Sequence, residues 1–201
     1  MAGRMTVLPD ERLVALRPEL MAALRDTARE VGGTAFAGFF DASMAGLLIA
    51  GFRRVGADEG TVWLLDEERS GLIPRFNSGP HAQRIVGGFR QSLSAGMISM
   101  VAATEQPICE NEVCKNERQD RTLDTELHVK TWAMLAVPFY FFGELSGVIS
   151  CVQLQPEDAA ETPPAGFRAG HVEELQHTAG LLSRLIEYRI LAQCLGLDGL
   201  G

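Results

Sequence analysis

The stretch MLAVPFYFFGELSGVISCVQL, residues 134–154, decides how this chain folds. Two almost wholly apolar runs flank Gly143-Glu-Leu-Ser-Gly147, a spacing that predicts two β-strands joined by a tight turn. Strands that are apolar on both faces are covered on both sides, so this hairpin is expected at the centre of a sheet. Pro138 donates no ladder hydrogen bond and therefore predicts a sheet edge or a bulge within the first strand.

Upstream of this hairpin, the spacing of apolar residues predicts two helices. The first covers Pro18 to Val31, with Pro18 in its first turn and Gly32-Gly33 after its end. The second covers roughly Phe39 to Val55, with Asp41 or Thr34 as its N-cap. The second helix is apolar around most of its circumference, which predicts that it is covered on several sides.

The middle of the chain changes period. A second hairpin is expected from strands at 61–65 and 72–78, separated by a polar turn. The segment 81–100 has helix-like patterning interrupted by Gly87-Gly88 and Gly96, and 106–111 resembles a short strand. From Cys114 to Lys130 the chain is polar and charged without clear periodicity, which predicts a long loop with room for one helical turn.

The last helix is expected from Arg168 to about Leu195, with apolar residues at alternating spacings of three and four. A second stripe, formed by Leu181, Leu185 and Tyr188, lies beside the first. One stripe can face the sheet and the other a partner, so we expect a homodimer. The predicted organisation is an N-terminal helical extension at 1–38, a domain at 39–195 and a flexible tail at 196–201.

Composition narrows the possible functions. The formal net charge is −8 and the pI is about 5.0, and no basic cluster exceeds Arg53-Arg54, which argues against nucleic acid or an anionic membrane as partner. No apolar run approaches the ~18 residues of a membrane span. Without a secretion signal, the four cysteines are expected to be reduced thiols in a cytoplasmic protein.

Four separated segments, in order, carry a family resemblance. They are Thr61-Val-Trp-Leu-Leu-Asp66, the run from Ser94 to Ile108, Trp132 to Phe139 with Gly143 and Gly147-Val-Ile-Ser, and the helix after Phe167. Together they resemble a GAF domain from about Phe39 to Ile190, although Ser99 and Glu105 replace two usual glycines. The resemblance implies an α+β fold: a six-stranded antiparallel sheet with helices packed on one face, flanking N- and C-terminal helices, and a ligand pocket in front.

The same resemblance implies a small-molecule site whose ligand the fold does not name. If the family geometry holds, the pocket is surrounded by the strand at 72–78, the segment 97–101, the strand at 108–111 and the loop that ends at Trp132. Its expected ligand-binding residues combine aromatic walls with a few polar groups, as small-molecule sites do. They are Arg75, Phe76, Met97, Glu110 and Trp132.

A cofactor alternative rests on His128, seven residues before Leu135. Haem-binding GAF sensors carry their iron ligand at the corresponding place, so haem is an open possibility, although Ser150 replaces their tyrosine. The motif of cyclic-nucleotide GAF domains and the Cys-His pair that attaches bilins are not found. Two further histidines, His171 and His177, lie about 240° apart on one helix and predict no shared metal ion.

An enzymatic alternative rests on cysteines, because some GAF proteins are free methionine-(R)-sulfoxide reductases. Cys109 and Cys114 lie about 16 Å apart if their segment is extended. That exceeds the ~7 Å limit for a disulfide unless the chain bends at Asn111. The reductase loop motif is not recognisable, and no phosphate loop, G-x-S-x-G or H-E-x-x-H occurs. The sequence therefore predicts a regulatory protein rather than an enzyme.

Three functional hypotheses follow from the sequence. The first is a cytosolic sensory protein that binds a small molecule and signals to a separate partner through its terminal helices. The second is a dimerisation or interaction module with a vestigial pocket, and the third is the reductase. A filled, polar-lined cavity would favour the first, and a pocket plugged by side chains such as Phe76 and Trp132 would favour the second.

Overall fold

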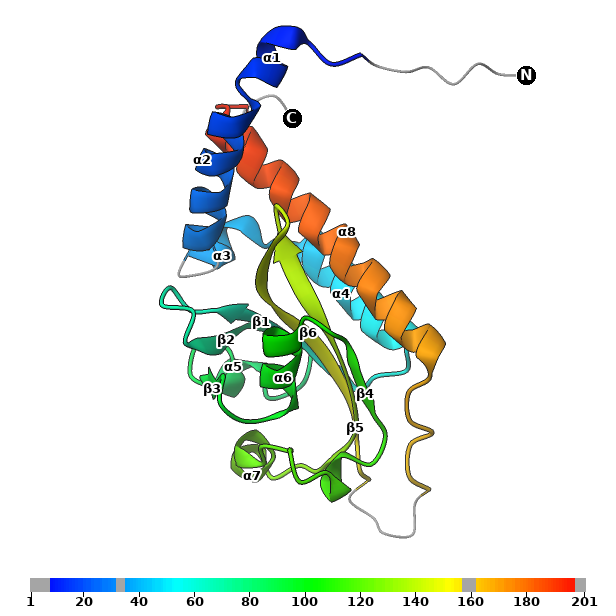
Figure 1. Cartoon of the computed structure of the whole chain (residues 1–201). Helices are drawn as coiled ribbons and strands as arrows, with labels where there is room; N and C mark the ends of the chain where they lie inside the picture. The colour runs from blue at the N-terminus through cyan, green and yellow to red at the C-terminus, as the bar shows by residue number, and fades with distance from the viewer. Residues whose placement is uncertain (1–7, 32–34, 157–161, 198–201) are drawn as a thin grey trace, which may run out of the picture.

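A computed structural model describes residues 8–31, 35–156 and 162–197 of the chain. Its centre is a six-stranded antiparallel sheet in the order β3-β2-β1-β6-β5-β4 (Figure 1). The strands are β1 (Glu59–Leu65), β2 (Gly71–Asn77), β3 (Gln91–Ser92), β4 (Ile108–Glu110), β5 (Thr131–Phe141) and β6 (Glu144–Leu154). This confirms the predicted α+β class and both predicted hairpins.

The β5–β6 hairpin is the central pair of the sheet. Phe142 and Gly143 form its turn with φ values of 48° and 79°, a left-handed pair that matches the twist of two-residue hairpins. Pro138 pairs with Val148 on one side, whereas β4 reaches only residues 134–136 on the other. The missing N–H of Pro138 therefore lies at an open sheet edge, as its sequence position predicts.

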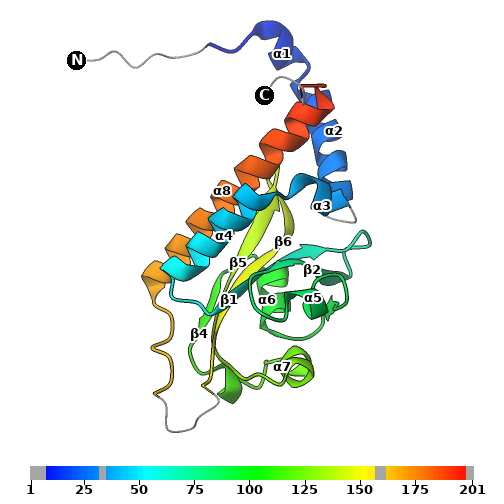
Figure 2. The ribbon, with the colours of Figure 1, turned by 180° about the vertical axis from the view of Figure 1, so that it is seen from behind.

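Two long helices, α4 (Ala42–Arg54) and α8 (Ala169–Cys194), cover one face of the sheet, and a third, α2 (Arg17–Glu30), packs against α8 near the tip of the β5–β6 hairpin (Figures 1 and 2). Helices α4 and α8 pack against each other, and α8 runs along β5 (Figures 1 and 2). Asp41 caps α4 by accepting a hydrogen bond from the Met44 backbone N–H, while the alternative cap, Thr34, lies outside the described residues. None of the helices within 8–31, 35–156 and 162–197 is long and apolar enough to cross a bilayer.

Shorter elements lie over the opposite face: α5 (Ala82–Ile85), α6 (Met97–Thr104), a 3-10 turn (Val113–Lys115) and α7 (Thr122–Leu127) (Figure 1). The expected helix-like segment 81–100 is wrong as one element, since it splits into α5, β3 and the start of α6. The glycines explain the split: Gly87 and Gly96 have φ values of 76° and 89°, which an α-helix does not accommodate.

The N-terminal segment contributes to the main core. Leu24, Ala28 and Val31 are buried together with residues of α4, β5 and α8, and Phe36 of the short α3 (Phe36–Phe39) joins them. A short helix, α1 (Glu11–Ala15), precedes α2 and buries nothing. The division at residues 38 and 195 stays a prediction, and most of the expected tail, 198–201, lies outside the described residues.

Gly147 of β6 provides a test of this sheet. A Cβ at Gly147 would lie 1.9 Å from the backbone oxygen of Trp63 on the neighbouring strand, which no rotamer change can relieve. We expect Gly147→Ala to lower the free energy of unfolding in urea by about 1–3 kcal/mol. The control is Gly46→Ala on the exposed face of α4, which meets nothing within 4 Å and should raise stability by about 0.5–1 kcal/mol. Equal effects would contradict the assigned register.

Candidate functional site

A narrow cavity lies between the sheet and the segment that carries α6 and α7, on the face opposite α4 and α8. Its volume is about 70 Å³, well below the ~300 Å³ at the lower end of drug-sized ligand pockets. It is nevertheless large enough for ordered water or a very small molecule. Its apolar side is formed by Met97, Ile98, Leu123, Leu127, Val129 and Met134.

Strand β1 forms the polar floor of this cavity, because strand alternation turns Glu59, Thr61 and Trp63 toward it. The Trp63 indole Nε1–H donates to Ser150 Oγ at 2.9 Å. The Asn77 amide donates to Thr61 Oγ1, also at 2.9 Å. Both hydrogen bonds are buried, and removing an acceptor would leave a donor unsatisfied at a cost of about 1–3 kcal/mol.

Two aspartates hold the α7 segment against the sheet. Asp124 accepts from the Thr131 backbone N–H at 2.9 Å and from the Thr131 hydroxyl at 2.8 Å. Asp120 accepts from the Gln91 amide at 3.0 Å and from the Thr122 hydroxyl, and these hydrogen bonds lower the pKa of its carboxyl. Both carboxylates line the cavity, so the wall that closes it is acidic.

Glu59 is the most unusual group in the cavity. Only 9% of the residue is exposed, and its Oε2 is buried without a hydrogen-bond partner. Burial raises the pKa of its carboxyl, and the neighbouring His81 partly opposes this rise. A buried carboxylate without a partner is costly, which makes Glu59 a candidate recognition group.

Of the five residues expected to bind a ligand, Met97 lines the cavity. Trp132 instead packs against the main core on the other face of the sheet. The reason is a β-bulge: Thr131 pairs with Leu154 and Ala133 with Gln153, so Trp132 is an extra residue that breaks the alternation.

A second bulge turns Phe76 away from the cavity. Val62 pairs with Phe76, but the next residue, Trp63, pairs with Pro74. Phe76 therefore joins the helix-covered core, where its ring lies 5.1 Å from that of Phe40. Arg75 is the bulged residue; it does not line the cavity, its Nε is buried without a partner, and burial lowers the pKa of its guanidinium.

Glu110 organises the loop after β4 rather than the cavity. Its carboxylate accepts from the Asn116 side-chain amide at 2.8 Å and from the Glu112 backbone N–H at 3.2 Å, and these hydrogen bonds lower the pKa of Glu110. It lies among the charged residues of a shallow surface depression. Short strand β4 thus leaves its side chain outside the pocket that the family resemblance implied for it.

His128 ends α7 in a left-handed conformation, with φ of 57°, and its side chain is exposed. Its neighbours Leu127 and Val129 line the cavity, but His128 does not. The cavity of about 70 Å³ is also far too small for a porphyrin. The residues present therefore do not fit haem.

All four cysteines are free thiols. Cys109 is exposed on the short strand β4, where partial burial and the adjacent Glu110 raise its thiol pKa. Cys151 is buried in the main core, and burial raises its pKa strongly. Both shifts oppose formation of the nucleophilic thiolate that thiol catalysis requires.

The comparisons with known proteins agree with this architecture. The family model for the GAF domain matches residues 41–187, and this chain belongs to the GAF domain family. GAF domains are in general small-molecule-sensing or regulatory modules. None of the curated proteins matches the sequence.

Several solved structures share the fold. The GAF domain of a phosphoenolpyruvate-protein phosphotransferase from Coxiella burnetii is 18% identical to this chain and superposes with a TM-score of 0.59. The match covers 88% of this chain and 96% of the Coxiella domain. The corresponding domain from Acinetobacter is 19% identical, with 89% and 97% coverage and a TM-score of 0.56. Free methionine-R-sulfoxide reductase from Neisseria meningitidis is 16% identical, with 96% and 99% coverage and a TM-score of 0.54. At these identities the likeness shows the fold alone.

Sequence reasoning missed Glu59, Gln119, Asp120 and Asp124. The sequence does contain a signal for Glu59. It is the first residue of a strand in which Thr61 and Trp63 follow at intervals of two, so all three side chains point to the same face of the sheet. For the other three no local signal exists. They come from a polar loop, and only its folding over the sheet brings them to the cavity.

Glu59→Gln tests the assigned burial through the pH dependence of stability. Because the folded-state pKa of Glu59 is raised, its contribution to stability is present at low pH and is lost as pH rises through that pKa. Glutamine carries no charge to desolvate, so the variant should be more stable than the parent by about 1 kcal/mol near neutral pH. The difference should vanish toward about pH 4.

The measurement is urea unfolding across this pH range. Glu68→Gln is the control, because Glu68 is exposed in the β1–β2 turn and should give no pH-dependent difference. A parent protein as stable as the Glu59 variant at neutral pH would show that the carboxylate is solvated.

Proposed function

We propose that this protein is a regulatory module that binds a small molecule in the cavity over β1 and transmits the bound state to a separate partner through α2 and α8. The observation that carries the proposal is the polar-lined cavity with a buried, unpartnered carboxylate. Phe76 and Trp132 lie on the other face and do not plug it. This favours ligand binding over an interaction module with a vestigial pocket.

Strand β5 connects the cavity to the helices. Thr131 and Met134 line the cavity, whereas Leu135, Val137 and Phe139 are buried in the core against the helical layer. Beyond them, the Ser183 hydroxyl of α8 donates to the Tyr140 carbonyl, and the Phe142 backbone N–H donates to Glu187. A shift of β5 on binding would thus move directly against α8.

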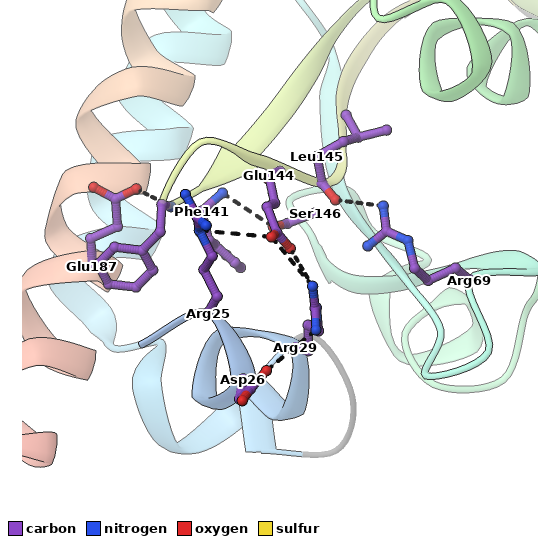
Figure 3. Close-up of polar contacts among 10 residues, drawn as sticks. Arg25, Asp26, Arg29, Arg69, Phe141, Glu144, Leu145, Ser146 and Glu187 are labelled. Atoms are coloured by element: carbon purple, nitrogen blue, oxygen red, sulfur yellow. Dashed lines mark hydrogen bonds and ion pairs between the residues drawn. The ribbon is translucent and has the colours of Figure 1, made fainter. Parts of the chain in front are cut away.

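The tip of the same hairpin also holds α2. Glu144 pairs with Arg29 at 3.1 Å and with Arg25 at 3.7 Å, while the Leu145 carbonyl accepts from Arg69 at 3.0 Å (Figure 3). Exposed ion pairs of this kind contribute at most about 1 kcal/mol each. Such weak ion pairs can break and form again easily. A ligand that binds only modestly better to one of the two arrangements, with the ion pairs formed or broken, can therefore shift the equilibrium between them.

Thiol catalysis is not part of this proposal, because the pKa values of Cys109 and Cys151 are raised. We place the protein in the cytoplasm on the basis of its sequence.

We also propose that it forms a homodimer through α8. Leu181, Leu185 and Tyr188 are 36%, 44% and 71% exposed and are spaced four and three residues apart, so they form one apolar stripe on the side of α8 away from the core.

Native mass spectrometry of the purified protein tests ligand retention and dimerisation together. We expect a dimer, with added mass from a retained small molecule. Leu185→Glu should shift the protein to monomer by placing charge in the stripe, whereas Val86→Glu, an exposed apolar position on the opposite side of the sheet, should not. A bare monomer of the parent protein would contradict both proposals.

The relay is tested by Glu144→Gln, which removes the charge that pairs with Arg25 and Arg29. Amide hydrogen exchange in residues 17–30 should accelerate about two- to fivefold, the factor that corresponds to 0.5–1 kcal/mol. Asp26→Asn is the matched control: Asp26 also pairs with Arg29, at 3.3 Å, but within α2. Unchanged exchange in Glu144→Gln, or equal acceleration in both variants, would overturn the proposed route.

A further inference from the structure

Two buried acceptor oxygens without hydrogen-bond partners belong to residues that line the same cavity: Oε2 of Glu59 and Oε1 of Gln119. The orientation of the Gln119 amide is fixed, because its nitrogen donates to Asp124 at 3.0 Å. Its oxygen is therefore the free atom. Buried polar atoms are rarely left unpaired, so two acceptors at one cavity indicate a ligand that brings hydrogen-bond donors.

The charge of the cavity points in the same direction. Glu59, Asp120 and Asp124 line it, and its lining contains no Lys, Arg or His. The side chains that donate to the two aspartates are neutral: Gln91 and Thr122 to Asp120, and Gln119 and Thr131 to Asp124. His81, which partly opposes the raised pKa of Glu59, lies outside the lining. The negative charge inside is therefore left for a cation to compensate.

An organic cation fits the cavity better than a metal ion. Among the described residues, no three His, Cys, Asp or Glu side chains come together as metal ligands. The opposite wall is apolar, with Met97, Leu123 and Met134, and the Trp63 indole lies on the floor. An alkyl group can bury against the methionines and leucine, and an ammonium group is attracted to an indole as well as to a carboxylate.

The packing around Glu59 leaves a defined space for its carboxylate. A Cβ at Gly79 would lie 1.6 Å from Glu59 Oε2, so the absence of a side chain at Gly79 makes the space that this carboxylate occupies. The small volume of about 70 Å³ limits the ligand to a few non-hydrogen atoms.

We infer that the cavity binds a small primary amine, with its ammonium group at Glu59 and Gln119 and its alkyl group against Met97 and Met134. This inference deepens the proposed function and rests on it, since it names the ligand class of the same cavity. An amine retains its proton near neutral pH, as the ammonium of lysine does.

Titration of the full chain with n-butylammonium, followed by NMR of ¹³C-methyl methionine, tests the inference. 1-Butanol is the neutral probe and butyrate the anionic one. We expect the Met97 and Met134 signals to shift with butylammonium, at an affinity at least ~30-fold above that for butanol, and butyrate not to bind. Glu59→Gln should remove this preference, and Gly79→Ala should weaken it by displacing the carboxylate without changing the charge. Glu68→Gln should leave it intact.

The outcomes separate this inference from the proposed function. If butanol shifts the same methionines as strongly as butylammonium, or if Glu59→Gln binds the amine unchanged, the amine assignment is overturned while the cavity remains a small-molecule site. If none of the probes shifts Met97 or Met134, the amine assignment is again overturned. Native mass spectrometry then decides separately whether the cavity retains any other molecule.

Discussion

Strands β5 and β6 are eleven residues long each, and the two faces of the ladder that they form meet different surroundings. On one face, Leu135, Val137, Phe139 and Ile149 lie in the core beneath α4 and α8. On the other, Met134 and Ser150 reach the cavity. Because strand side chains alternate, this one ladder determines the position of both the apolar core and the polar cavity. A one-residue slip in its register would exchange the two.

The cavity exists because the second face is covered by short and partly polar elements. Asp120 and Asp124 bind the α7 segment to Gln91 and Thr131 through hydrogen bonds rather than through a large apolar contact. A cover held mainly by hydrogen bonds has a lower local stability than the apolar core. The helices on the first face are joined to the sheet by extensive apolar burial and change position less readily. The proposed function assigns recognition to one side of β5 and output to the other.

Sequence patterns predict the elements better than the site. Helix α8, both hairpins and Asp41 as one of two expected caps follow from spacing and capping chemistry, and the family resemblance supplies the six-stranded antiparallel sheet. The expected site fails at Trp132, which is itself a bulged residue, and at Phe76, which lies beside one. An extra residue in a strand reverses the alternation locally and leaves no mark in hydrophobicity, so aromatic residues assigned to the cavity lie in the core instead.

The sequence by itself determined the α+β class, the antiparallel hairpins and the long terminal helix, because these depend on periodicities within single segments. The tertiary structure alone decided that Glu59, Gln119 and Asp124 share one cavity and that His128 does not line it. These residues are up to 65 positions apart, and their meeting depends on how a loop without periodicity folds over the sheet. Hydrogen bonds between distant residues, rather than local propensity, determine the conformation of this loop. The acidic cavity is therefore a property of the assembled sheet and the segment that covers it.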